Sequence, residues 1–216
     1  KKGYYKEEGI DLTVLRGSGS ADSAKKIDLG QADVGISDAP TVLTAISKGA
    51  NLKMVAVVYD KAGNNVFFRK SANIKTPKDL VGKKIAVPPA DSHRVLWPAF
   101  AAMHGIDPAS VTLVNVKPEG KQAIVAAGEV DGSFDLYTSY AIWEKVLGKG
   151  EVANLLWADF GLPIYGHTYF VNNELLQKNP KLVERFLRAT HKGWRDAKAN
   201  PTASIDAMVE TVPGLD

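Results

Sequence analysis

The stretch Leu29-Gly30-Gln31-Ala32-Asp33-Val34-Gly35-Ile36-Ser37-Asp38 is echoed by Ala127-Gly128-Glu129-Val130-Asp131-Gly132-Ser133-Phe134-Asp135-Leu136. Each stretch ends a predicted helix at a glycine, turns at Gln-x-Asp or Glu-x-Asp, and enters an apolar run typical of a strand. Each also follows a strand, a Gly- or Pro-rich polar loop and a helix start, over residues 15–20 in the first case and 87–92 in the second. Turn sequences of this kind are common, but the shared order of elements favours two lobes of similar architecture.

Short apolar runs alternate with helical patterns along the whole chain. Strands are predicted over residues 10–15, 33–36, 52–59, 66–69, 84–87, 111–116 and 132–137. Helices are predicted over residues 20–29, 40–48, 92–104, 120–127, 140–147 and 181–198. This alternation predicts an α/β fold with mainly parallel sheets that are covered on both faces. Two strand-like stretches, 63–69 and 166–172, are predicted to form the paired crossings between the lobes.

The composition excludes several classes of protein. The 27 basic and 24 acidic residues give a formal net charge of +3, and they are spread along the chain without the clusters typical of nucleic-acid-binding surfaces. The absence of cysteine excludes disulfides, thiolate metal sites and cysteine nucleophiles. No His/carboxylate spacing is typical of a metal site, and no motif calls for a cofactor. No apolar run approaches the ~20 residues that span a bilayer.

Ligands of open α/β sheets bind beyond the carboxyl ends of the strands, where helix N-termini offer unpaired N–H groups. In the first lobe this rule selects a loop with Ser18, Gly19 and Ser20 and a strand end with Ser37 and Asp38. Small residues let the backbone approach a ligand, and the hydroxyls and the carboxylate are able to bind it. The polar side chains also suit helix caps, so both roles stay open for each of them.

In the second lobe the rule selects Asp91 and Ser92, which open a predicted helix, and Asp135, which lies near the end of a predicted strand. Arg94 is unfavourable close to the positive end of a helix. We therefore expect Arg94 to reach an anion or a carboxylate such as Asp135, with a solvated side chain on the first turn as the alternative.

Aromatic residues follow Asp135. Tyr137 leads to Tyr140 and to Trp143-Glu144, and ring faces beside an acid suit a flat heterocycle that carries amino groups. His167, close to a predicted crossing, is expected to line the cleft. The other three tryptophans are expected to fill cores: Trp97, Trp157 and Trp194.

Several segments, in this order, resemble the nitrate/sulfonate/taurine-type solute-binding proteins of ABC transporters and the related family that binds thiamine-pyrimidine precursors. They cover nearly the whole chain, at residues 3–12, 17–20, 30–35, 79–87, 128–131, 169–173 and 186–189. The resemblance implies a type II periplasmic-binding-protein fold of two α/β lobes with a hinge. Lobe 1 is predicted to begin over residues 1–83, lobe 2 to span 84–164, and residues 165–216 to return to lobe 1 and form C-terminal helices. The abrupt ends of the chain predict a fragment without an N-terminal strand and some C-terminal helices.

The resemblance implies the solute-binding component of an ABC importer, which traps a small polar molecule and delivers it to a permease in the inner membrane. Such a protein is a monomer in the periplasm, or is lipid-anchored outside the cell. The aromatic run favours an aromatic or heterocyclic solute such as a pyrimidine precursor, whereas Arg94 favours a sulfonate- or nitrate-type anion. The fungal, enzymatic branch of the family carries a cysteine-rich motif that this chain lacks, so we predict that the chain is not an enzyme. An enzyme of thiamine-pyrimidine biosynthesis on the same fold and a periplasmic sensor module are the alternatives.

Overall fold

The computed structural model describes residues 2–211, which fall into two compact units. The helical unit joins the residues up to Arg16 with those from Asn173 onward, and the main unit spans Gly17–Asn172 and holds both β-sheets. The predicted outer ends of the lobes, residues 1 and 216, lie outside the described residues.

The larger sheet of the main unit has five strands in the order β5-β4-β6-β3-β7. β4 (Lys84–Val87) is parallel to β5 (Thr112–Asn115) and to β6 (Gly132–Leu136). β3 (Asn64–Arg69) is antiparallel to β6 and to β7 (Val152–Leu156). β7 is absent from the predicted strands, because it follows a Gly-rich turn and shows no clear alternation of apolar and polar residues.

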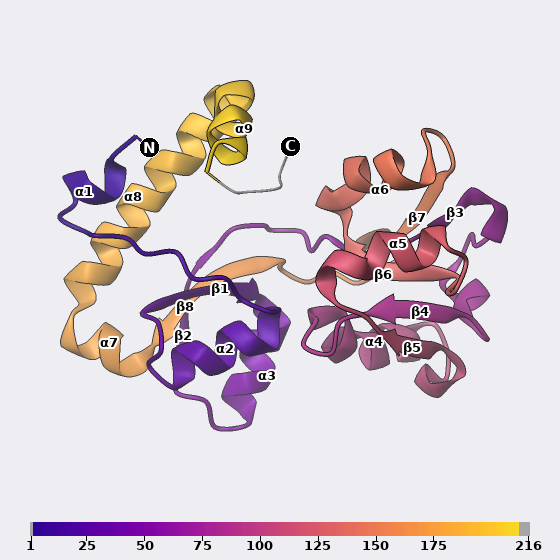
Figure 1. Cartoon of the computed structure of the whole chain (residues 1–216). Coiled ribbons are helices and arrows are strands. Elements are labelled where there is room, and N and C mark those ends of the chain that lie inside the picture. The colour runs from indigo at the N-terminus through magenta and orange to yellow at the C-terminus, as the bar shows by residue number, and fades with distance from the viewer. Residues whose placement is uncertain (1, 212–216) are drawn as a thin grey trace. The chain divides into compact units, whose positions relative to one another are not determined.

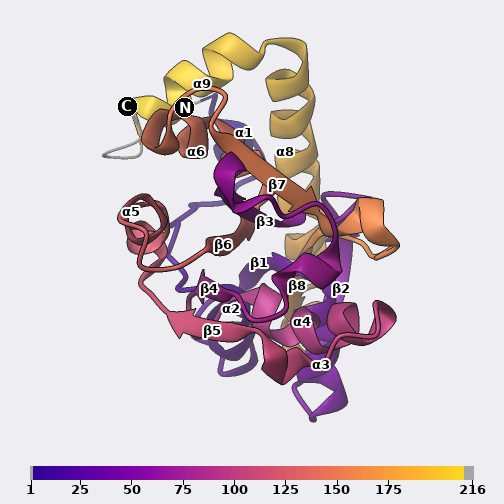
Figure 2. The same cartoon turned by 90° about the vertical axis from the view of Figure 1, so that its right-hand side faces the viewer.

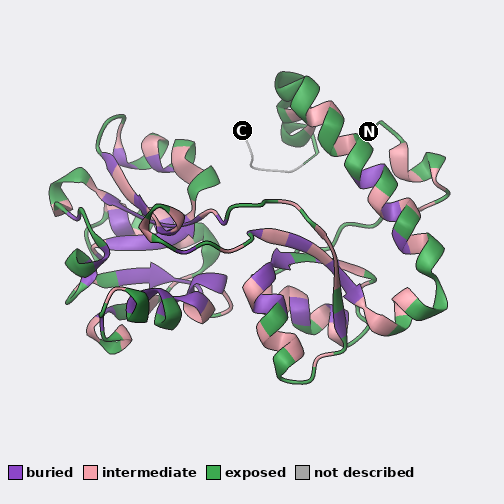
Figure 3. Cartoon of the chain, turned by 180° about the vertical axis from the view of Figure 1, so that it is seen from behind, coloured by how far each residue is buried: buried purple, intermediate pink, exposed green. Residues whose placement is uncertain are grey.

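Alternation along β3 divides the core of this sheet between two faces. Phe68 packs on one face in the same cluster as Phe134. Phe67 packs on the other, where its ring stacks on Trp143 with centroids 5.1 Å apart. Both faces are therefore covered, as predicted, and Figure 3 shows buried residues along these strands. The covering helices are α4 on one side and α5 and α6 on the other (Figure 1), at Ser92–Met103, Lys121–Ala126 and Tyr140–Leu147.

The smaller sheet has β8 (His167–Asn172) between β1 (Val34–Asp38) and β2 (Leu52–Val57), and β8 is antiparallel to both neighbours. Its core holds Ile27 of α2 (Ser20–Asp28), Val42 of α3 (Ala39–Ser47) and Phe170. The two helices lie together beside this sheet (Figures 1 and 2). Across the two sheets most strand pairs are antiparallel, so the prediction of mainly parallel sheets is wrong. The reason is that β3 and β8 are each antiparallel to both neighbouring strands, and the order of elements along the chain does not reveal strand direction.

The two sheets are joined by residues 58–63, between β2 and β3, and by residues 157–166, between β7 and β8. These crossings pair with each other through backbone hydrogen bonds. Val58 N donates to His167 O at 2.8 Å, Gly166 N to Tyr59 O at 2.9 Å, and Ala62 N to Ile164 O at 3.0 Å. A pair of crossings is therefore present, but its bounds differ from the prediction. The predicted stretches 63–69 and 166–172 largely form β3 and β8 of different sheets, and the pairing lies at residues 58–62 and 164–167.

The sequence echo corresponds to a repeated backbone conformation. Gly30 follows α2 with a φ of 66°, and Gly128 follows α5 with a φ of 76°. Both angles lie in the left-handed region that favours glycine, and each turn then leads into a strand, β1 or β6. The helices of the main unit also begin and end within one or two residues of the predicted bounds, and Tyr140–Leu147 agrees at both ends.

The helical unit consists of α1 (Tyr4–Glu7), α7 (Asn173–Lys178), α8 (Pro180–Ala199) and α9 (Pro201–Val209). In this unit the Tyr5 ring packs against Phe186 of α8, with centroids 5.5 Å apart. The predicted strand over 10–15 is wrong, because no described segment pairs with it. The predicted helix over 181–198 is confirmed as α8. Short 3-10 turns occur at Lys70–Ala72, Pro77–Leu80, Pro108–Ser110, Pro118–Gly120, Tyr137–Ser139 and Trp157–Phe160.

Candidate functional site

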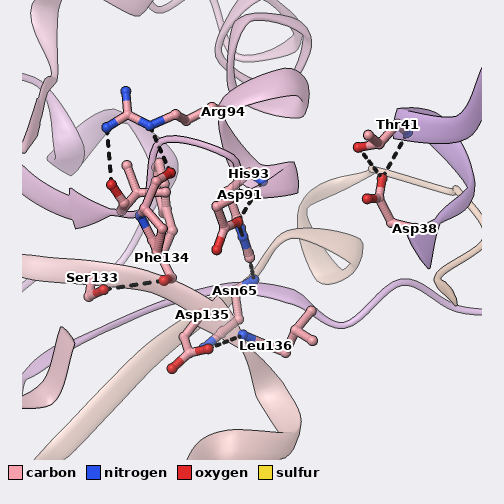
Figure 4. A network of polar contacts seen from close by, with 12 residues as sticks. Asp38, Thr41, Asn65, Asp91, His93, Arg94, Ser133, Phe134, Asp135 and Leu136 are labelled. Carbon is pink, nitrogen blue, oxygen red and sulfur yellow. Dashed lines mark hydrogen bonds and ion pairs between the residues drawn. The ribbon is translucent and has the colours of Figure 1, made fainter. Parts of the chain in front are cut away.

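Asp38 lies at the end of β1 and caps α3. Its Oδ1 accepts hydrogen bonds from Thr41 N and Thr41 Oγ1, both at 3.0 Å. Its Oδ2 is buried and has no hydrogen-bond partner among the described residues. Figure 4 shows that Oδ2 points away from Thr41. One oxygen therefore serves the helix, and the other is an unsatisfied acceptor, which is costly inside a protein unless a ligand or water binds it.

Of the other residues predicted for the first lobe, Ser37 is buried and its Oγ donates to Ser20 O at 3.3 Å. Ser18 is exposed, and its backbone N–H donates to Asp22 Oδ2 at 2.9 Å. Gly19 begins α2 in close contact with the second predicted loop, because a Cβ at Gly19 would lie 2.6 Å from Ala90 O. The structure thus brings the two predicted loops together, at a position where only glycine fits.

In the second loop, Asp91 caps α4 and binds His93. Asp91 Oδ1 accepts from His93 N at 2.9 Å and lies 2.6 Å from His93 Nδ1. Burial alone would raise the pKa of Asp91, but its contacts with His93 outweigh burial and lower the pKa to about 2. Ser92 is buried at the first helical position.

Arg94 does not bind Asp135, and it is not solvated on the first turn. Its Nε donates to Pro88 O and its Nη2 to Val87 O, each at 3.0 Å, and Nη2 also donates to Asn115 Oδ1. Arg94 therefore does not reach Asp135, because the last carbonyls of β4 and the loop after it take up the guanidinium, and an anion at Arg94 stays a prediction.

Asp135 instead pairs with Lys121 inside the main unit. Lys121 Nζ lies 2.6 Å from Asp135 Oδ1, and Trp143 Nε1 donates to Asp135 Oδ2 at 3.0 Å. The carboxylate also accepts from the N–H of Leu136 and from the amide of Gln122. Both oxygens are thus occupied by the protein in this conformation.

The aromatic run divides between core and surface. Tyr137 is 47% exposed, with its ring centroid 6.0 Å from that of Tyr140, but Trp143 is fully buried. Among the tryptophans expected in cores, Trp97 and Trp157 are buried as predicted, whereas Trp194 is 45% exposed on α8.

His167 pairs with Asp38 across β1 and β8. Burial lowers the pKa of His167 below its ordinary value of 6.5, Asp38 raises it in part, and His93 lowers it further. Two residues from different predicted lobes, Asp38 and His93, therefore both influence this ring. The strand ends with Asp38, His167 and the Asp91–His93 pair form our candidate site.

Sequence reasoning missed other members of this site. His93 Nε2 accepts from Asn65 N at 3.3 Å, and the side-chain nitrogens of Asn64 and Asn65 are buried without a partner among the described residues. The doublet Asn64-Asn65 at the start of a predicted crossing is a signal that could have found the two amides. Nothing in the sequence singles out Lys121.

Comparison with known proteins identifies the relatives of the chain. The family described as "NMT1/THI5 like" matches residues 1–204. A Legionella pneumophila protein named 4-amino-5-hydroxymethyl-2-methylpyrimidine phosphate synthase is 24% identical over 99% of this chain and 67% of its own length. The formylaminopyrimidine-binding protein of Halalkalibacterium halodurans is 25% identical over 97% of this chain and 63% of its own length. The chain thus spans about two-thirds of these relatives.

Solved structures show the fold. The alkanesulfonate-binding protein SsuA from Xanthomonas axonopodis, bound to MOPS, matches with a TM-score of 0.80 and 19% identity over 97% of this chain and 73% of its own. A Candida albicans protein described as having the generic periplasmic binding protein fold matches with a TM-score of 0.74 and 16% identity over 98% of this chain and 70% of its own. The predicted periplasmic-binding-protein fold is confirmed.

The prediction that the chain is not an enzyme is contradicted. Relatives from Legionella and from yeast, at 24–25% identity, are named as a pyrimidine phosphate synthase. Among the described residues, no helix is long and apolar enough to cross a membrane.

Proposed function

Because the chain belongs to the NMT1/THI5-like family, we propose that it is the solute-binding component of an ABC importer and that its solute is an amino-substituted heterocycle such as a pyrimidine precursor. The solute binds at the strand ends with Asp38 and Asp91. Closure of the predicted lobes around the crossings then excludes water and presents the loaded protein to a permease, from the periplasm or from a lipid anchor outside the cell.

The buried, unpartnered Oδ2 of Asp38 carries this proposal. A carboxylate oxygen only accepts hydrogen bonds, so its partner in a ligand must be an N–H or O–H group. The unpaired amide nitrogens of Asn64 and Asn65 are donors, and ring nitrogens accept from donors of this kind. An aminopyrimidine offers an amino group to Asp38 Oδ2 and a ring nitrogen to an amide donor. Asn64 and Asn65 alternate along β3, so one of the two amides, and not both, faces a given side of the sheet.

The charges of the candidate site argue against a sulfonate or nitrate. Arg94 is bonded to carbonyl groups, and Lys121 is paired with Asp135 at 2.6 Å. Asp38 and Asp91 are both acids, and an anion beside them would lose energy by repulsion. The name of the formylaminopyrimidine-binding relative supports the same class of solute.

Ligand-dependent thermal stability tests the proposal. A ligand that binds only the folded chain stabilises it by about 2.7 kcal/mol at a concentration of 100 times Kd. We expect 4-amino-5-hydroxymethyl-2-methylpyrimidine or formylaminopyrimidine to raise the Tm, and MOPS, alkanesulfonates and nitrate to leave it unchanged. A shift with the sulfonates alone would overturn the proposed solute class.

Asp38→Asn tests the atom that carries the argument. Asparagine keeps an oxygen for Thr41 but replaces the free acceptor with a donor, so affinity is expected to fall about ten-fold or more by calorimetry. Asp107→Asn is the matched control, because Asp107 also caps a short helical turn, through Ala109 N at 3.0 Å, but is exposed. If Asp38→Asn binds like the parent, Asp38 is not a ligand contact.

A pyrimidine phosphate synthase is the second candidate function, favoured by the names of the Legionella and yeast relatives. The enzymatic branch suggests an iron-linked reaction, but the described residues contain no group of three or more His, Asp or Glu side chains placed to bind a metal ion. Incubation with iron and a pyridoxal cofactor, followed by mass spectrometry of the chain and of the pyrimidine fraction, tests this function directly.

A further inference from the structure

His93 connects two parts of the candidate site. Its side chain is buried, with Nδ1 2.6 Å from Asp91 Oδ1 and Nε2 3.3 Å from Asn65 N. The Asn65 N–H is a donor, so Nε2 must accept and carries no proton. The proton of the neutral ring is then on Nδ1 and is donated to Asp91. Figure 4 shows this chain of contacts from Asp91 through His93 to Asn65.

Aromatic neighbours hold the His93 ring in this orientation. Phe134 stacks on it at 5.5 Å with an interplanar angle of 13°, and Trp157 meets it edge-on at 5.2 Å and 87°. Rotation of the ring would clash with the two neighbours, because packed interiors leave little free space. Each ring nitrogen therefore keeps its partner.

The Asp91 carboxylate is fixed at one oxygen only. His93 N and Nδ1 both bind Oδ1, Oδ2 has no hydrogen-bond partner among the described residues, and the side chain is 17% exposed. Asp38 holds a comparable second bond, from Thr41 Oγ1, whereas the side chain of Asp107 accepts only the backbone N–H of Ala109 among the described residues. The extra bond from a buried ring restricts Asp91 beyond what capping α4 requires.

We propose that His93 is a positioning residue, which holds Asp91 with Oδ2 available to an N–H donor of the ligand and ties that carboxylate to Asn65 at the start of β3. His93 then acts on affinity through Asp91 and does not itself touch the ligand. The solute class rests on the proposed function, whereas the bond from Nδ1 does not.

Two substitutions separate the ring nitrogens. His93→Asn places an amide nitrogen near the position of Nδ1 and retains a donor for Asp91, whereas His93→Gln extends toward the position of Nε2 and retains an acceptor for Asn65. By calorimetry with 4-amino-5-hydroxymethyl-2-methylpyrimidine, His93→Asn is expected to stay within about three-fold of the parent Kd, and His93→Gln to weaken binding about ten-fold or more. In an Asp91→Ala background, the same His93→Gln exchange is expected to have no further effect on Kd.

Equal losses in His93→Asn and His93→Gln, or an undiminished loss in the Asp91→Ala background, would mean that His93 only fills the core, and would overturn the proposal. Nitrogen NMR of His93 in the ligand-free parent provides a readout that needs neither a ligand nor a variant. A protonated Nδ1 and an unprotonated Nε2 are expected, and the opposite tautomer rejects the positioning bond. If the parent shows this tautomer but binds no aminopyrimidine, the proposed solute is wrong while the bond to Asp91 stands.

Discussion

Asp38 serves the fold with one oxygen and leaves the other for a ligand. The sequence pattern Ser37-Asp38-Ala39-Pro40 predicts a helix cap, and the bonds from Thr41 to Oδ1 confirm the cap. The same pattern does not predict the burial of Oδ2, because that burial depends on segments far away in the chain. The cap was therefore predictable, whereas the unsatisfied acceptor was not.

His167 gives the stability of the chain a defined dependence on pH. The folded pKa lies below 6.5, so between the two values the unfolded chain holds a proton that the folded chain does not. Unfolding then takes up a proton, and stability falls as the pH decreases through this window. Urea unfolding from about pH 7.5 to about pH 5 is expected to show this loss, and His167→Asn to reduce its slope. A variant with the parent's slope contradicts the assignment to His167.

At the scale of elements, two glycines are expected to respond oppositely to alanine. A Cβ at Gly132 of β6 would lie 2.6 Å from Phe67 O, a backbone atom that cannot move aside alone, so Gly132→Ala is expected to destabilise the chain by about 1–3 kcal/mol. Gly193 lies inside α8 with nothing within 4 Å of a Cβ. Gly193→Ala is expected to stabilise the chain by about 1 kcal/mol, because alanine is the better helix former. Denaturant unfolding measures both changes. If the two substitutions change the free energy of unfolding in the same direction, the explanation is wrong.

Elements with a local signal were predicted best. The start of α4 follows from the cap at Asp91, and the ends of α2 and α5 follow from glycines in the left-handed region. Strands depend on distant partners, so the apolar run at 10–15 remains unpaired among the described residues although its pattern is typical of a strand.

At the scale of the whole molecule, the paired crossings hold the connection between the two sheets of the main unit. The amides of Val58, Ala62 and Gly166 donate across the pair, so hydrogen exchange at these positions is expected to be slow. A Cβ at Gly166 would lie 3.0 Å from Tyr59 Cβ and 3.3 Å from Ala62 Cα. Gly166→Ala is therefore expected to speed exchange at Val58 and Ala62 about ten-fold, as a loss of ~1.4 kcal/mol would.

Gly63→Ala is the control for this experiment. Gly63 lies in the same crossing, but a Cβ there would meet only Tyr137 N, at the ordinary contact distance of 3.9 Å. In Gly63→Ala, the exchange rates at Val58 and Ala62 are expected to equal those of the parent. Similar acceleration in both variants would indicate a general loss of stability, and would remove the special role of the crossing.

The sequence by itself determined the α/β class, the periplasmic-binding-protein fold, the repeated helix-glycine-strand unit and the strand ends where polar residues gather. The α/β class, the repeated unit and the strand ends follow from periodicity, caps and glycines, which act over a few residues, whereas the periplasmic-binding-protein fold follows from the resemblance to a known family. Only the tertiary structure decided that most strand pairs are antiparallel and that Arg94 binds the end of β4. It also decided that Lys121 pairs with Asp135 and that His93 connects Asp91 with Asn65. Each of these depends on which distant segments meet. A buried polar group binds the nearest partner that the fold supplies, and a local sequence pattern does not predict that partner.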